Sequence, residues 1–169
     1  MRTPFPSKYN KELTDEKTRI ATIACLQAHL SLAIAGTKAT TEMAFEVMVH
    51  AASTGQSIEA SCSELVGSAA SNTLREHLNQ AFVAEELSKL ENEVNAALAA
   101  KLPKQVRKYK RELAIDLHDQ PFYGKDEGLL RYASRGQAKA GTTYFYRIAS
   151  VYLILDGLRF TLAVLFVYG

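Results

Sequence analysis

The sequence predicts an α+β protein, with helices over residues 1–102 and β-strands over residues 103–169. Two observations predict this class. Apolar residues recur at three- and four-residue steps through most of the first region, which is typical of amphipathic helices. After residue 110 this period is lost, and segments rich in aromatic and β-branched residues alternate with turns that contain Gly and Pro. We therefore expect two domains, a helical one over 1–102 and a strand-rich one over 103–169.

Composition and charge are those of a folded protein with an uneven distribution of charge. The 169 residues are 47% hydrophobic and 22% charged, which is typical of a globular domain. Residues 1–102 carry nine Lys and Arg against twelve Asp and Glu, whereas residues 103–169 carry eleven against six. Much of the positive charge falls in one short basic run: Lys104, Arg107, Lys108, Lys110 and Arg111. This basic run predicts a phosphate-binding face, and a solvated linker is the alternative.

No feature of the sequence indicates export or a membrane. The first residues lack the apolar core of a signal peptide. Cys25 and Cys62 do not form a metal-binding pair, and they fit a reducing, cytoplasmic setting. The apolar stretch 144–168 is interrupted by Arg147, Asp156 and Arg159, so it contains no run long enough to span a bilayer.

The first region predicts five helical segments. The first opens with Thr14 as a cap and ends at Gly36, and the second covers 40–53. Two shorter segments follow at 57–67 and 68–82, and a longer amphipathic segment covers 82–103. We expect this last helix to pack against the earlier ones. Its pairing with a second copy of the chain, which would give a homodimer, is the alternative.

The two short helical segments have the layout of a helix-turn-helix. A turn of small residues separates them, and the second begins with the polar residues Asn72, Thr73 and Arg75. These three side chains are the candidate DNA contacts of the helical region. An ordinary helical hairpin is the alternative, because Glu59, Glu64 and Glu76 make the local charge unfavourable for DNA.

The second region predicts three strands, over 112–117, 142–155 and 158–167. Asp156 and Gly157 separate the last two, and this dipeptide is a strong signal for a hairpin turn because both central positions of such a turn need positive φ. The last two strands are therefore expected to form a hairpin.

Asp116 is the candidate catalytic residue. It lies among four apolar residues in "LAIDL", where a buried carboxylate is costly unless it meets a cation, a donor or a metal. Such a carboxylate has a function when its strand lies beside a cleft, because the acid can then bind Mg²⁺ ions together with other carboxylates. Mg²⁺ ions held in this way promote the cleavage of phosphodiesters. The alternative is that Asp116 ends a strand and caps a turn. We expect His118 to point away from it.

The segments "LPKQVRKYKRELAIDLHDQPFYGKDEG" and "RGQAKAGTTYFYRIASVYLILDGLRFTLAVLFV" resemble the start of the catalytic domain of insertion-sequence DDE transposases, in the branch common in archaea and cyanobacteria. In that family the pattern "IDxxDxPYYG" marks the first strand of a ribonuclease-H-like fold and contains the first metal-binding Asp. The resemblance implies that Asp116 is this residue and a Mg²⁺ ligand. Asp119 is then a further candidate ligand of the metal, and its simpler alternative role is that of a turn former.

The resemblance also implies an incomplete catalytic domain. The family needs a second Asp and a Glu beyond the third strand, and this chain contains neither. It therefore implies a truncated transposase with a helix-turn-helix that binds the terminal repeats of the element, and with only the first three strands of the ribonuclease-H-like domain. Such a chain is expected to be inactive alone. The alternative is a DNA-binding module or regulator derived from a transposase.

Overall fold

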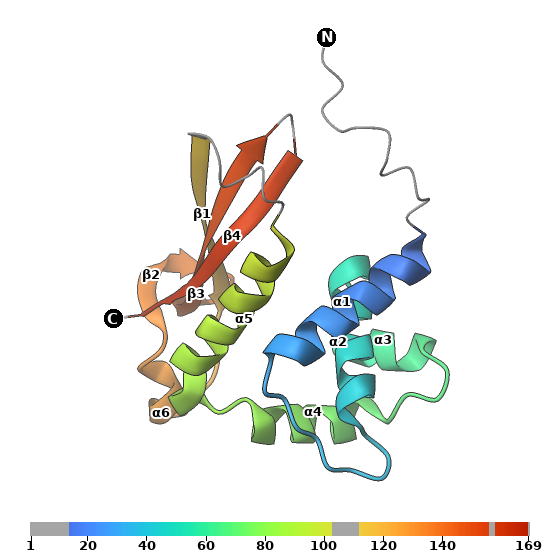
Figure 1. Cartoon of the computed structure of the whole chain (residues 1–169). Helices are drawn as coiled ribbons and strands as arrows, with labels where there is room; N and C mark the ends of the chain where they lie inside the picture. The colour runs from blue at the N-terminus through green and yellow to red at the C-terminus, as the bar shows by residue number, and fades with distance from the viewer. Residues whose placement is uncertain (1–13, 103–111, 156–157, 169) are drawn as a thin grey trace. The chain divides into compact units, whose positions relative to one another are not determined.

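The computed structural model describes residues 14–102, 112–155 and 158–168. It confirms the α+β class, because helices fill the first part of the chain and an antiparallel sheet fills the last (Figure 1). The chain divides into two compact units, Met1–Val83 and Ala84–Gly169. The division falls before the last long helix, whereas the sequence-based boundary falls after it, at residue 102.

Over its described residues, 14–83, the first unit contains four helices: α1 (Asp15–His29), α2 (Thr41–Thr54), α3 (Ile58–Glu64) and α4 (Ser71–Ala81). Side-chain caps begin three of them. Thr14 accepts a hydrogen bond from the Lys17 N–H, and Thr40 and Ser57 cap α2 and α3 in the same way. Gly55 ends α2 in the left-handed conformation, with φ of 70°, which a glycine adopts without strain. The predicted Thr14 cap is therefore confirmed.

The first helix is shorter than predicted. It ends at His29 instead of continuing to Gly36, and residues 30–36 are not helical; the chain bends at 37–38, between the bridge partners Ala35 and Thr40. The physical reason is the pattern in "SLAIA", where Leu32 and Ile34 are buried and the residues between them are exposed. This alternation has the period of an extended chain and not of a helix.

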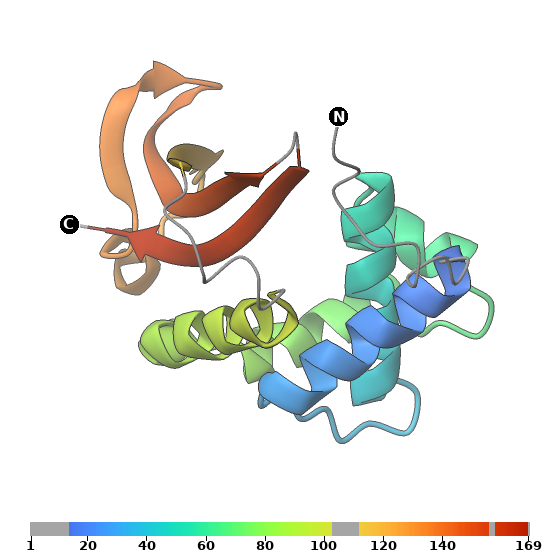
Figure 2. The same cartoon turned by 45° about the horizontal axis from the view of Figure 1, so that its top comes forward.

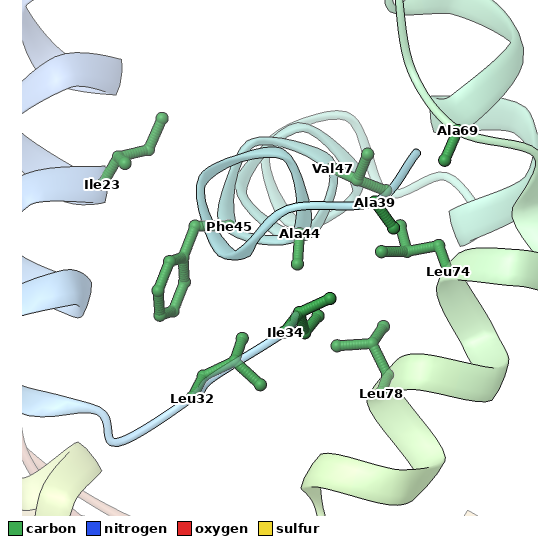
Figure 3. Packing of buried hydrophobic residues seen from close by; sticks show 10 residues of the cluster. All are labelled: Ile23, Leu32, Ile34, Ala39, Ala44, Phe45, Val47, Ala69, Leu74 and Leu78. Carbon is green, nitrogen blue, oxygen red and sulfur yellow. The ribbon is translucent and has the colours of Figure 1, made fainter. Parts of the chain in front are cut away.

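The core of the first unit gathers side chains from α1, α2, α4 and the extended segment between α1 and α2 (Figure 3). Phe45, Val47 and Leu74 are fully buried in it. Leu32 and Ile34 point into the same cluster, toward Leu78 (Figure 3). The extended segment therefore contributes as much to the core as a helix would, because its buried face is apolar.

The second unit contains a 3₁₀ turn (Ala84–Glu86), two helices and four strands: α5 (Leu87–Lys101), β1 (Glu112–Pro121), α6 (Glu127–Leu130), β2 (Ser134–Lys139), β3 (Thr142–Leu155) and β4 (Leu158–Val167). The three predicted strands are present. The fourth, β2, has the sequence "SRGQAK", which lacks β-branched and aromatic residues and so gives no strand signal. No described helix is long and apolar enough to cross a membrane.

Strand β3 is the centre of the sheet. It pairs antiparallel with β1 along one edge, and with β2 and then β4 along the other. The register places Leu155 opposite Leu158, which confirms the hairpin of β3 and β4; Asp156 and Gly157 lie outside the described residues. Asp116 lies opposite Ser150, near the middle of the β1–β3 ladder.

Helix α5 runs along β4, as both Figures 1 and 2 show. Two of its side chains, one helical turn apart, bind the backbone of this strand. Asn95 hydrogen-bonds both the N–H and the carbonyl of Val164, at 2.8 and 2.9 Å, and the Glu91 carboxylate accepts from the Phe166 N–H at 2.8 Å. The outer edge of β4 is thus covered by a helix, which removes one site for pairing with another strand. Within the second unit, helix α5 therefore packs on the sheet.

Candidate functional site

Strand β1 presents Asp116 to solvent. Residues 112–121 pair with β3 in a continuous register, so their side chains alternate between the two faces of the sheet. Asp116 is exposed and shares its face with His118. The expectation that His118 points away from Asp116 was wrong, because residues two apart in a strand lie on the same face. The exposed position explains how a carboxylate is tolerated in an apolar segment.

Asp119 lies on the opposite face and binds an arginine. It faces Arg147 directly across the β1–β3 ladder, and the guanidinium donates two hydrogen bonds to the carboxylate, at 2.7 and 3.0 Å. These hydrogen bonds lower the pKa of the Asp119 carboxyl and raise that of Arg147. The expectation of a turn-forming role was wrong, because Asp119 lies inside β1 and its side chain pairs across the sheet.

The two predicted metal ligands are therefore not brought together. Asp116 and Asp119 are three residues apart in one strand and project from opposite faces. Within the described residues, no group of three or more His, Cys, Asp or Glu side chains gathers in a way that could hold a metal ion. Asp116 alone does not supply the several oxygen ligands of a Mg²⁺ site, so the described residues do not fit this ion.

Helix α4 positions the candidate DNA contacts of the first unit. Leu74 and Leu78 anchor one face of the helix in the core. Asn72 and Arg75 are exposed on another face, and Thr73 is half-buried beside them. Of the three predicted contacts, two are thus free to reach a ligand from the surface.

The exposed face of α4 continues beyond the residues predicted. Asn79 and Gln80 are also exposed, and Asn79 lies seven residues after Asn72, two helical turns along the same face. Sequence analysis missed both, although the spacing of Asn72, Arg75 and Asn79 at three- and four-residue steps would have found one of them. Amide and guanidinium groups are the side chains that read base edges most often.

The charge on this face is mixed. Arg75 Nη2 lies 3.5 Å from a carboxylate oxygen of Glu59 on α3, and both side chains are largely exposed. Glu76 follows Arg75 and is exposed as well. A surface ion pair of this length is weak and is readily exchanged for a phosphate or a base. The pair therefore reduces the positive potential of the face without fixing Arg75.

The basic run from Lys104 to Arg111 lies outside the described residues, so its five predicted DNA contacts have no structural account.

Comparisons with known proteins gave no match: no family model, no curated protein and no solved structure resembles the chain closely enough to be identified as a relative. The functional interpretation therefore depends on the quoted motifs and on the geometry of β1 and α4.

Proposed function

We propose that the chain is the N-terminal part of an insertion-sequence DDE transposase, which binds DNA at the ends of the element in the cytoplasm and does not cut DNA by itself. The observation that carries the proposal is the position of Asp116. This carboxylate is exposed in the middle of β1, the strand that contains most of "IDLHDQPFYG", the segment with the most specific resemblance to the family.

The arrangement of strands supports the same interpretation. Strands β1, β3 and β4 are antiparallel neighbours in space, as expected of the first three strands of a ribonuclease-H-like domain, and β2 adds a short hairpin with β3. The apolar face of β1 is exposed: Leu113, Ile115 and Leu117 are 60%, 71% and 58% accessible. On β3 the same face is buried at Leu153 and Ala149, so the exposed part is the one on β1, which is consistent with a domain in which further elements would cover this strand.

The absence of further carboxylates near Asp116, among the described residues, is the reason to expect no cleavage. Hydrolysis by two metal ions requires several acidic ligands that hold both ions about 4 Å apart. In the complete family enzyme, the second Asp and the Glu would supply them. Asp119 does not replace either one, because it is bound to Arg147 on the other face.

DNA binding is assigned to the exposed face of α4, with Asn72, Arg75 and Asn79 as the side chains that reach base edges. Two buried leucines fix this helix to the core, so its exposed side chains are presented from a rigid support. Helix α3 precedes it, and the two helices are in contact, as in a helix-turn-helix. The basic run would add contacts to phosphates.

A cleavage assay separates the incomplete enzyme from a complete one. The purified chain would be incubated with Mg²⁺ and end-labelled duplexes taken from the DNA that flanks its gene, where terminal repeats would lie. We expect no nicking above that of a matched Asp116→Asn variant. Robust nicking that Asp116→Asn abolishes would show a complete active site and overturn the proposal.

The second candidate function is a non-catalytic DNA-binding regulator derived from a transposase. The binding of Asp119 by Arg147 favours it, because this acid is committed to the sheet and not to a metal. A regulator would compete with the full-length enzyme for the element ends. Inhibition of strand transfer by the chain at concentrations that saturate the DNA would support this role, and unchanged strand transfer would exclude it.

A further inference from the structure

The outer edge of β1 has backbone groups available for pairing. Phe122, just after β1, donates its N–H to the Tyr144 carbonyl of β3 at 2.9 Å. Because the backbone groups of successive residues point to alternate edges of a strand, those of Leu113, Ile115 and Leu117 point away from β3. The backbone of Pro121 also points away from β3, so the N–H that proline lacks does not remove a hydrogen bond between β1 and β3. No described strand pairs with this edge.

The same three residues carry the exposed apolar side chains of β1. Leu113, Ile115 and Leu117 project from one face of the sheet, where their register partners on β3 are Leu153, Val151 and Ala149. Leu165 and Val167 of β4 continue this face and are 42% and 38% accessible. Leu153 and Ala149 are themselves buried, so the exposed apolar surface of β1 lies along its free edge, and an edge strand of this kind is the usual starting point for pairing with another strand.

We propose that a second copy of the chain pairs with this edge, with β1 antiparallel to its own copy and the two-fold axis at Ile115. In this register Ile115 faces Ile115 of the second copy, and Leu113 faces Leu117. All three residues have outward-pointing backbone groups, so each position gives a hydrogen-bonded pair. The two four-stranded sheets become one sheet, and their apolar faces become continuous.

Charge and apolar complementarity together select this register. It places Glu112 opposite His118 of the second copy, twice by symmetry, and an imidazole donates a hydrogen bond to a carboxylate whether or not it is charged. These pairs fall at positions without ladder bonds, where opposing side chains are closest. A two-fold axis at Ala114 would instead oppose Glu112 and Asp116, and an axis at Asp116 would oppose two Asp116 carboxylates. An axis at Leu117 would oppose Asp116 and His118, but it would place the Asp119 carboxylate, which is bound to Arg147, opposite Ile115.

Pairing through the β1 edge stops at two copies. Pairing around a two-fold axis uses the same edge of both chains and leaves no second copy of that edge exposed. The outer edge of β4 is already covered by Asn95 and Glu91 of α5. This proposal does not depend on the proposed function, because none of its residues is assigned to DNA binding.

A charge exchange across the interface tests the register. Sedimentation equilibrium of the full chain would measure the dimer dissociation constant for the wild type, Glu112→Lys, His118→Glu and the double variant. Both side chains are exposed, so the fold is unaffected. In the His118→Glu variant two carboxylates face each other at each symmetric contact, so the dimer dissociation constant should rise about tenfold. In the double variant the dissociation constant should return to within about threefold of the wild-type value.

The control is Glu127→Lys, which changes an exposed charge on α6, away from the β1 edge. It should leave the dissociation constant unchanged. A wild-type chain that stays monomeric throughout the accessible concentration range would overturn the proposal. So would a double variant that is as weak as His118→Glu, because the two residues would then not face each other.

Discussion

The side-chain amide of Asn95 replaces a neighbouring strand for one residue of β4. Its Nδ2 donates to the Val164 carbonyl at 2.9 Å, and its Oδ1 accepts from the Val164 N–H at 2.8 Å. Both contacts join residues that are 69 positions apart in the sequence. Helix α5 therefore belongs with the sheet in structure as well as in the division of the chain into compact units.

Replacing Asn95 by Ala should destabilise the second unit by about 1–2 kcal/mol, because a partly buried N–H and carbonyl would lose their partners. Urea denaturation followed by circular dichroism measures this change. The matched control is Asn92→Ala, since Asn92 is exposed on the same helix. Equal stabilities of the two variants would contradict the role of Asn95.

Leu74→Ala should destabilise the first unit by about 2–5 kcal/mol, because Leu74 is fully buried and its truncation leaves a cavity in the core. Thermal melting monitored at a helical wavelength measures the loss. Val66→Ala serves as the control, because Val66 is fully exposed. A cost below about 0.5 kcal/mol for Leu74→Ala would mean that α4 is not anchored as described.

The pair of Asp119 and Arg147 predicts a dependence of stability on pH. The pKa of Asp119 is lower in the folded chain than in the unfolded one, where it is about 3.9. The pair therefore stabilises the fold at pH values above the unfolded-state pKa, and this contribution is lost as the pH falls through the folded-state pKa. Asp119→Asn should consequently cost more stability at pH 7 than at pH 3.

A double-mutant cycle isolates this effect. Asp119→Asn would be measured by urea denaturation in the wild type and in an Arg147→Ala background, at both pH values. In the Arg147→Ala background, the pH dependence of the cost should largely disappear. A cost that is the same at both pH values in the wild type would show that the ion pair does not contribute.

Glu59→Gln should strengthen DNA binding by the first unit. Glu59 lies 3.5 Å from Arg75 and reduces the positive potential of the exposed face of α4. Loss of this charge should lower the dissociation constant for duplex DNA about threefold at low salt. The control is Glu42→Gln, an exposed acid on α2. An equal gain from both variants would mean that only net charge matters and that Arg75 has no specific role.

Periodicity predicted the strongly patterned elements of the fold and failed where tertiary packing decides the structure. Helix α2 and strand β3 follow directly from their residues, because each has a long apolar pattern of one period. The prediction of a helix over "SLAIA" was wrong, since Leu32 and Ile34 are buried in a cluster formed with residues of α1, α2 and α4 and not by a helical face of their own. Strand β2 has no local signal and exists through its pairing with β3.

The candidate site was predictable in its residue types and less so in its geometry. Asp116 stood out because a carboxylate inside an apolar strand needs an explanation, and its exposure supplies one. The hydrogen bonding of Asp119 to Arg147 could not be foreseen, because it depends on the register of β1 and β3, which brings together two residues 28 positions apart. Of the exposed amide side chains of α4, Asn72 was predicted, whereas Asn79 was missed although its spacing from Asn72 places it on the same face.

The most direct test of the proposed DNA binding compares two arginines of the full chain. Arg75 on α4 and Arg131 after α6 each form an exposed ion pair, with Glu59 and Glu85 respectively. Fluorescence anisotropy would measure binding to labelled duplexes from the DNA that flanks the gene, over a series of salt concentrations. We predict saturable binding that weakens steeply with salt, a loss of about tenfold for Arg75→Ala and no change for Arg131→Ala. No binding at low salt, or equal losses for both variants, would contradict the assignment of α4 as the DNA-binding helix.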